Sequence, residues 1–135
     1  MVSDVLMSIR PMYTEAILAG TKTVELRRRR PSFSRGTRIL VYATSPDQRV
    51  QGAFDVGGVI EDSPEGLWPT IEHRAGVDRE TFDSYFSGCD VAFAIEVENP
   101  RRIVPAALPI RPPQSYQFLD AEEPRHRGLL ELAAP

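Results

Sequence analysis

Short apolar stretches separated by glycine and proline run along most of the chain, and they predict strands more than helices. Largely apolar runs cover residues 5–9 and 38–43, and a period-two alternation covers residues 21–28 and 91–98. Residues 49–61 are also β-like, but three glycines interrupt them, which is typical of a strand that bulges and bends. The pattern predicts a small curved sheet.

One weaker β signal follows towards the end of the chain. Asn99 and Pro100 are predicted to end the preceding strand, and residues 102–108 are predicted as the last paired strand. A proline-rich loop then leads into residues 114–119. The remaining residues, 121–135, are polar and are expected to form a weakly helical tail.

Three short helices are predicted between the strands. The first begins at Pro11 and ends at Gly20, because proline suits the first helical position and glycine suits the C-terminal stop. Residues 65–75 and 79–86 form the other two, the latter capped by Asp78, within one crossover. Together with the strands they predict an α+β fold: a small mixed β-barrel with short crossover helices.

The length and composition suit one hydrophobic core. With 135 residues and 41% hydrophobic content, we expect a single domain over residues 1–120, followed by the tail. No apolar run approaches the roughly 20 residues of a membrane span, and the first ten residues do not resemble a signal peptide. We therefore expect a cytoplasmic protein with no membrane partner; its oligomeric state stays open.

Metal-ligating side chains are few and scattered. Cys89, His73 and His126 are the only soft ligands, so neither a disulfide within the chain nor a structural zinc site is expected, and no cofactor is indicated. Aromatic residues at helical spacing, Trp68, Tyr85 and Phe86, are expected in the core.

Charge is distributed unevenly, which changes the interpretation of the net charge of −3. Residues 1–60 contain nine Lys and Arg against five Asp and Glu, whereas residues 61–135 contain seven against fourteen. Fifteen of the sixteen cationic residues are arginine, and the single lysine is Lys22. A basic face able to attract phosphate is therefore expected on an otherwise acidic molecule.

The informative motif is residues 20–27, Gly-Thr-Lys-Thr-Val-Glu-Leu-Arg, which follows the first predicted helix. A glycine, a lysine two positions on, a glutamate and an arginine in this arrangement resemble the signature of the ASCH family. Residues 7–11 and 36–43 resemble its flanking strands, and residues 60–64 and 93–96 fit more loosely. Residues 113–116 resemble a bacterial and archaeal subgroup described as transcriptional regulators.

The resemblance implies a PUA-like barrel whose cleft presents Lys22, Glu25 and Arg27 to a ligand. These groups suit a nucleotide, because the cations can hold phosphate or base acceptors and the carboxylate can accept from a base amine. Strict strand alternation would place Lys22 on the opposite face, so a bend near Thr23 is required. An ordinary surface salt bridge among the three residues is the alternative.

Further candidates surround this trio. Ser45 and Tyr116 are possible ligand contacts, although a turn-capping or packing role is open for each. A basic segment is expected to form a rim that contacts nucleic acid, and the alternative is that its arginines lie in a solvated loop. Phe33 in this segment either stacks on a base or covers the core. Its members are Arg28, Arg29, Arg30, Phe33, Arg35 and Arg38.

Three functions follow from these features. The first is a binding module for RNA, single-stranded nucleic acid or a nucleotide. The second is an enzyme, either a ribonuclease or a metal-independent amidohydrolase similar to a small bacterial member of the superfamily that acts on acetylcytidine; Lys22, Thr23 and Glu96 would then be catalytic. The third is a protein-interaction domain, which the acidic second half of the chain would suit.

Overall fold

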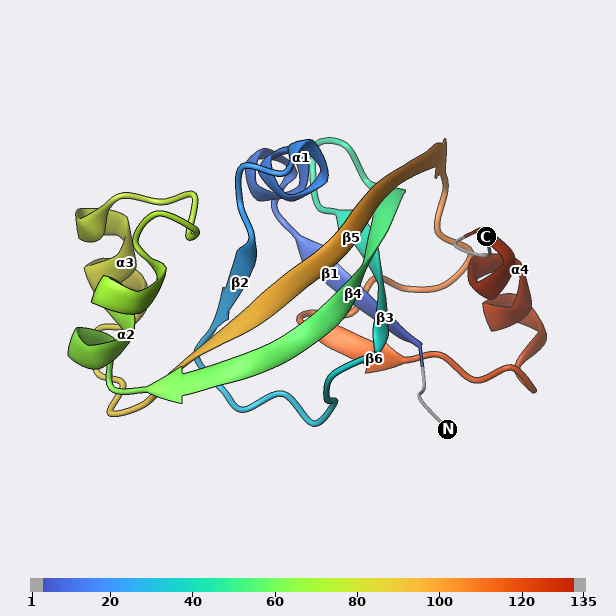
Figure 1. Cartoon of the computed structure of the whole chain (residues 1–135). Coiled ribbons are helices and arrows are strands. Elements are labelled where there is room, and N and C mark those ends of the chain that lie inside the picture. The colour runs from blue at the N-terminus through green and yellow to red at the C-terminus, as the bar shows by residue number, and fades with distance from the viewer. Residues whose placement is uncertain (1–3, 133–135) are drawn as a thin grey trace.

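The computed structural model describes residues 4–132 and shows six strands and four helices there (Figure 1). The strands are β1 (Val5–Ile9), β2 (Val24–Arg27), β3 (Arg38–Ala43), β4 (Arg49–Asp62), β5 (Ala92–Ala106) and β6 (Tyr116–Phe118). The helices are α1 (Pro11–Ala19), α2 (Pro64–Ile71), α3 (Arg79–Tyr85) and α4 (Pro124–Leu132). The predicted α+β class is confirmed.

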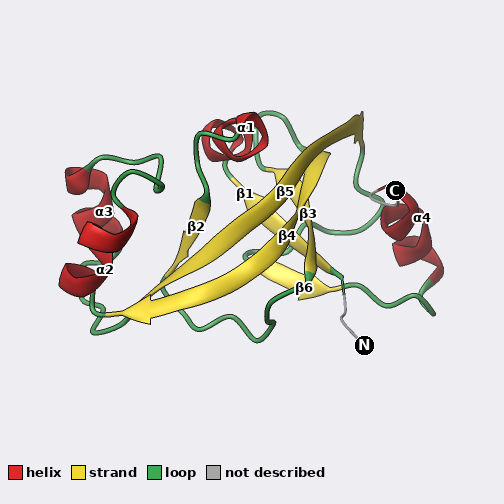
Figure 2. Cartoon of the chain, in the orientation of Figure 1, coloured by secondary structure: helices red, strands yellow, loops and turns green. Residues whose placement is uncertain are grey.

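All six strands belong to one mixed sheet with the order β2-β5-β4-β3-β1-β6 (Figure 2). β1 runs parallel to β3, and the other neighbouring strands are antiparallel. The sheet curls into a half-barrel whose edge strands, β2 and β6, do not pair with each other. This arrangement confirms the predicted mixed barrel and leaves an open seam beside β1.

The neighbouring strands β4 and β5 are long, with 14 and 15 residues, and this corrects one predicted break. Asn99 and Pro100 do not end a strand, because β5 continues through them to Ala106. Asn99 has a left-handed backbone with φ of 50°, and the β4–β5 register shifts between Ala53 and Asp55. The local bulge accommodates the proline, and pairing resumes at Arg101 opposite Ala53.

The helices follow their local signals closely. α1 begins at Pro11 and stops at Gly20, whose φ of 86° requires the left-handed conformation that glycine adopts without strain. Asp78 caps α3 by accepting from the backbone N–H of Thr81 at 2.8 Å. α2 ends at Ile71, four residues earlier than predicted, and a loop connects it to α3.

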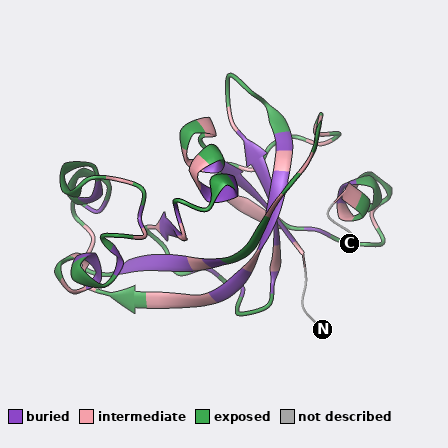
Figure 3. Cartoon of the chain, turned by 45° about the horizontal axis from the view of Figure 1, so that its top comes forward, coloured by how far each residue is buried: buried purple, intermediate pink, exposed green. Residues whose placement is uncertain are grey.

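Hydrophobic residues form separate clusters on the two sides of β2. Val5, Ile39, Phe54 and their neighbours fill the barrel, whereas α2 and α3 pack around a second core. We call residues 64–85 the helical lobe; it lies at one end of β4 and β5, and α4 lies on the other side of the sheet (Figure 1). In Figure 3, buried residues follow the strands while helix exteriors and loops are exposed.

The segment predicted as a tail contains α4. Its Leu129 is buried and packs with Leu40 and Tyr42 of β3 in a third cluster. The domain limit at residue 120 stays a prediction. Within residues 4–132, none of the helices combines the length and the apolar character that a membrane span needs.

Candidate functional site

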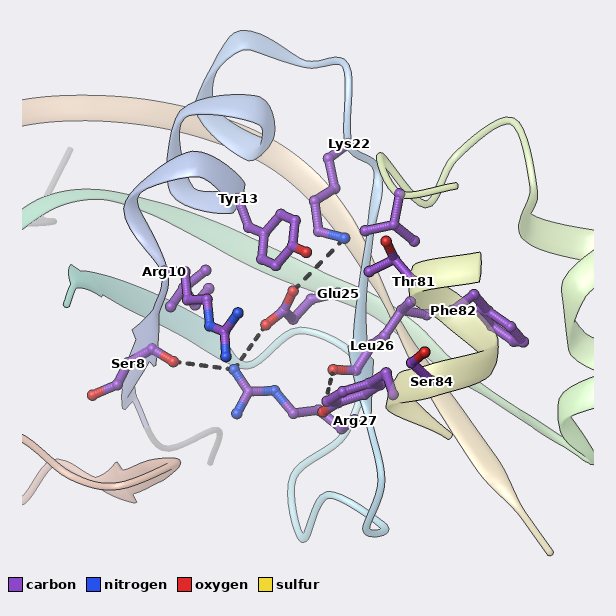
Figure 4. A pocket seen from close by; sticks show the side chains of 13 residues that line it. Ser8, Arg10, Tyr13, Lys22, Glu25, Leu26, Arg27, Thr81, Phe82 and Ser84 are labelled. Atoms are coloured by element: carbon purple, nitrogen blue, oxygen red, sulfur yellow. Dashed lines mark hydrogen bonds and ion pairs between the residues drawn. The ribbon is translucent and has the colours of Figure 1, made fainter. Parts of the chain in front are cut away.

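A cavity of about 410 Å³ lies beside β2, between α1 and α3 (Figure 4). β2 positions its chemistry through strand alternation. Val24 and Leu26 pack into the core of the helical lobe, and Glu25 and Arg27 point to the opposite face. Glu25 and Arg27 line the cavity, to whose wall Leu26 also contributes. We call this cavity the cleft.

Lys22 also lines the cleft, and the bend that strict alternation required is present. β2 begins only at Val24, three residues later than predicted, so Lys22 precedes the strand. Its backbone N–H donates to Ala16 of α1 at 3.0 Å, and Thr23 N–H donates to Arg74 of the helical lobe at 2.9 Å. These contacts turn the chain and release Lys22 from the alternation of the strand.

The side chain of Lys22 is buried, with an exposed fraction of only 2%. Its Nζ donates to the carbonyl oxygen of Ala75 and lies 4.9 Å from the ring centroid of Tyr13. Gly76 allows the loop to approach, since a Cβ there would lie 3.0 Å from Lys22 Cβ. Burial lowers the pKa of Lys22, an effect that the negative charge of Glu25 partly opposes.

Arg27 joins the two sides of the open seam. Its Nη2 donates to Glu25 Oε2 at 2.8 Å and to the carbonyl oxygen of Ser8 in β1 at 3.2 Å, and its Nη1 donates to Ser115 Oγ at 3.0 Å. The other Glu25 oxygen, Oε1, is 4.0 Å from Lys22 Nζ. One carboxylate therefore lies between two cations at the cleft (Figure 4).

Both helices that flank the cleft contribute residues that the sequence interpretation missed. Tyr13 comes from α1, and Arg10 is the residue before that helix. α3 supplies Thr81, Ser84 and Tyr85. The last three share one helix face at spacings of three and four, and Phe82, the buried residue of α3, lines the cleft beside them, so a helical wheel of α3 could have identified this face.

Tyr85 corrects an expectation about the core. Trp68 and Phe86 are buried as predicted, but Tyr85 is 40% exposed and lines the cleft. Its hydroxyl donates to the carbonyl oxygen of Leu26 at 3.2 Å, which holds the ring beside β2. Partial burial raises the pKa of Tyr85.

Two predicted ligand contacts, Ser45 and Tyr116, do not line the cleft. Ser45 is exposed in the turn after β3. Tyr116 makes hydroxyl hydrogen bonds with Ser32 and an edge-to-face contact with Phe33 at 5.0 Å between ring centroids. Phe33 is itself buried in the barrel core. Of its two predicted roles, the structure therefore shows the one in which it covers the core.

The predicted arginine rim divides into two groups. Arg28, Arg29, Arg30 and Arg35 are exposed in the loop after β2. Arg38, by contrast, begins β3 at the opposite end of β1 from the cleft, and it contacts Asp4 and the carbonyl oxygen of Leu130 in α4. Arg38 therefore does not belong to a rim beside the cleft.

Within the exposed group, two arginines already have partners. Arg28 Nε donates to Cys89 Sγ at 3.2 Å, and Arg30 pairs with Glu61. Such exposed contacts are weak and exchange readily with solvent, so these side chains remain accessible.

The residues that the amidohydrolase alternative requires are not gathered in the cleft. Arg74 donates to Thr23 Oγ1 at 3.1 Å and to Glu96 Oε2 at 3.2 Å, and neither Thr23 nor Glu96 lines the cavity that contains Lys22. Between residues 4 and 132 there is also no group of three His, Cys, Asp or Glu side chains placed to hold a metal ion.

Comparisons with known proteins give this chain a family and several relatives. The family model of the ASCH domain matches residues 7–101. An ASCH domain-containing ribonuclease from Zymomonas mobilis is 30% identical over 128 residues, which cover 89% of this chain and 86% of that protein. The large ribosomal subunit protein uL22 of Ureaplasma parvum is 27% identical over 88 residues, 61% of this chain but 28% of that protein.

The fold is similar to solved ASCH structures. The crystal structure of ASCH from Zymomonas mobilis has a TM-score of 0.89 at 28% sequence identity, with 98% of this chain and 96% of that chain covered. The agreement extends beyond residues 7–101 and therefore includes the segments that form β6 and α4.

Proposed function

The chain belongs to the ASCH domain family, and from this premise we propose that its cleft binds single-stranded RNA by taking up one nucleotide between α1 and α3. The convergence of Lys22, Glu25 and Arg27 on one cavity carries this proposal. The carboxylate can accept from a base amine or imide, and the two cations can donate to base acceptors or to phosphate. A cavity of about 410 Å³ is within the usual size range of small-ligand pockets.

A single strand suits this cleft better than a duplex. Base edges are occupied by pairing in a duplex, whereas an unpaired nucleotide can leave the stack and enter a pocket. The exposed arginines after β2 would contact the phosphates that flank the inserted nucleotide, which adds affinity without sequence preference. These are Arg28, Arg29, Arg30 and Arg35.

Ribonuclease activity is the second candidate, and one geometric observation favours it. Lys22 Nζ and Glu25 Oε1 lie 4.0 Å apart in the cleft, and burial lowers the pKa of Lys22. A carboxylate and an amine with a lowered pKa are groups that can exchange protons with a substrate. The relative from Zymomonas mobilis is named a ribonuclease, which supports RNA as the ligand class in either case.

A role in transcriptional regulation would follow from nucleic-acid binding. It rests only on the motif at residues 113–116, from which Ser115 contacts Arg27. Binding is therefore the property to measure first.

The test is a comparison of two isosteric variants, Glu25→Gln in the cleft and Glu15→Gln on the exposed face of α1. Titration of a short single-stranded RNA is expected to give saturable binding to the unsubstituted protein that Glu25→Gln weakens about tenfold or more. Glu15→Gln should change the affinity less than about twofold. Binding that is equally strong for all three proteins would contradict the proposal.

The same mixtures separate the two candidates. Electrophoresis of the RNA after incubation would show shortened products if the ribonuclease reading is correct. Intact RNA together with saturable binding would leave the binding module as the function.

A further inference from the structure

Four charged side chains line the cleft, and their charges do not balance. Arg10, Lys22 and Arg27 are cations, and Glu25 is the only carboxylate among the lining residues. Charges removed from water are costly unless an opposite charge compensates them. The cleft therefore has an excess of positive charge that the described residues do not neutralise.

Glu25 is committed mainly to Arg27. The contact between Glu25 Oε2 and Arg27 Nη2 is a 2.8 Å hydrogen-bonded ion pair, whereas Lys22 Nζ lies 4.0 Å from Oε1. Lys22 is almost completely buried, so water screens its charge little, and its contacts with the Ala75 carbonyl and the Tyr13 ring supply no negative charge. The lowered pKa of Lys22, caused first by burial, agrees with incomplete neutralisation.

Arg10 supplies a second cation that no carboxylate of the described residues pairs with, although water solvates its exposed side chain. Its side chain is exposed and makes no hydrogen bond or ion pair with any group of residues 4–132, whereas its backbone carbonyl accepts from Thr14 N–H at 2.8 Å. Figure 4 shows the Arg10 guanidinium on the side of the cleft formed by Ser8 and α1. It points towards the guanidinium of Arg27 and the carboxylate of Glu25. A guanidinium with all its donors available is well suited to a phosphate.

We propose that the cleft recognises a nucleotide by its terminal phosphate, so that the protein binds the phosphorylated end of an RNA, or a free mononucleotide, in preference to an internal nucleotide. This inference rests on the proposed function, because it assigns the ligand of the same cleft. A terminal phosphomonoester carries about −1.5 to −2 charges at pH 7, whereas an internal phosphodiester carries one. The monoester therefore matches the two cations that remain once Glu25 pairs with Arg27.

The experiment uses one short RNA sequence prepared with hydroxyl ends, with a 5′-phosphate or with a 3′-phosphate, together with uridine and its 5′- and 3′-monophosphates. Calorimetric titration of the full chain is expected to show about tenfold or tighter binding for one phosphorylated form over the hydroxyl form. The phosphorylated form that gains affinity identifies which end enters the cleft, and the mononucleotides show whether a free nucleotide suffices.

Two variants locate the effect. Arg10→Gln is expected to reduce the advantage of the phosphate to less than about threefold, since one charge-assisted contact is lost. Arg49→Gln removes an exposed arginine that does not line the cleft and should leave the advantage unchanged. Thermal melting of both variants checks that each is folded.

The outcomes distinguish this inference from the proposed function. Equal affinity for the hydroxyl and phosphorylated RNAs, with binding still weakened by Glu25→Gln, would overturn terminal-phosphate recognition and leave RNA binding in place. An unchanged phosphate advantage in Arg10→Gln would also overturn it. Absence of binding to every RNA would remove the proposed function itself.

Discussion

Two carboxylate–arginine pairs lie on neighbouring elements of this protein in very different surroundings. Glu15 of α1 and Arg102 of β5 make two hydrogen bonds, at 2.7 and 2.9 Å, but their side chains are 65% and 53% exposed. Glu25 and Arg27 of β2 make one contact of 2.8 Å, and their side chains are 8% and 15% exposed. The exposed pair has the better contact geometry.

The difference lies in whether each pair is complete. Glu15 and Arg102 neutralise each other and are solvated, so nothing in their surroundings requires a further ion. Glu25 is shared between Arg27 and the buried Lys22, and all three side chains line a cavity. Incomplete neutralisation inside a cavity, rather than close ion-pair geometry, therefore distinguishes the candidate site.

We expect a large loss of RNA binding from Lys22→Met, which removes the buried cation of the cleft. Methionine keeps much of the apolar stem that packs beside Gly76 and removes only the ammonium. We expect RNA affinity to fall by about 10- to 150-fold, the range for losing a hydrogen bond to a charged group. The free energy of unfolding should change by less than about 1 kcal/mol, because the cost of burying the cation disappears together with its contacts.

RNA titration and chemical denaturation of the same preparations measure the two quantities. A loss of about 3 kcal/mol or more in unfolding free energy, without a specific effect on RNA, would assign Lys22 a structural role instead.

Arg27→Lys tests the side chain that bridges the seam. A single ammonium cannot replace a guanidinium that donates to Glu25, Ser8 and Ser115 at once. We expect about tenfold weaker RNA binding and a destabilisation of about 1–2 kcal/mol.

Arg101→Lys in β5 is the matched control, since Arg101 pairs with Asp55 and does not line the cleft. Parallel titrations of both variants compare the two effects. If Arg101→Lys weakens RNA binding as much as Arg27→Lys does, the seam has no special role.

A pH titration sharpens the contrast through Lys22. Because burial lowers its pKa, the folded protein releases this proton at a lower pH than the unfolded chain, in which the pKa is about 10.4. Between these two values the unfolded state binds more protons, so the free energy of unfolding rises with pH. RNA affinity should fall over the same interval, as the ammonium that faces the anion is lost.

The measurement is the unfolding free energy of the unsubstituted protein minus that of Lys22→Met from pH 7 to pH 10. We expect this difference to increase with pH in favour of the unsubstituted protein. The raised pKa of Tyr85 acts in the opposite direction above about pH 10, but it is present in both proteins and cancels. A difference that stays constant would show that Lys22 titrates normally.

The smallest effect is expected at the exposed pair. Arg102→Gln removes one partner of a solvated ion pair, so the melting temperature should shift by less than about 3 °C and RNA affinity by less than about twofold. Thermal melting and RNA titration check both values. A large loss of RNA affinity would show that the ligand extends from the cleft across α1.

The predictable part of the fold rests on signals that act over a few residues. Pro11 and Gly20 define α1, and Asp78 caps α3, because each effect depends on backbone groups within about four positions. The predicted end of the strand at Asn99 is wrong, because a bulge accommodates the proline that cannot donate a ladder hydrogen bond. Pairing with β4 on both sides of the bulge then continues the strand.

The candidate site shows the same division. Local sequence signals predicted the helix and the strand that flank Lys22, and the motif indicated Lys22, Glu25 and Arg27 through the family resemblance. The folded chain was needed to show that Lys22 is buried under the helical lobe, that Tyr85 lines the cleft and that Arg27 contacts Ser115, 88 positions away. Periodicity and capping report on neighbours along the chain, whereas burial, charge balance and cavity shape depend on segments that only the folded sheet and the packed helices bring together.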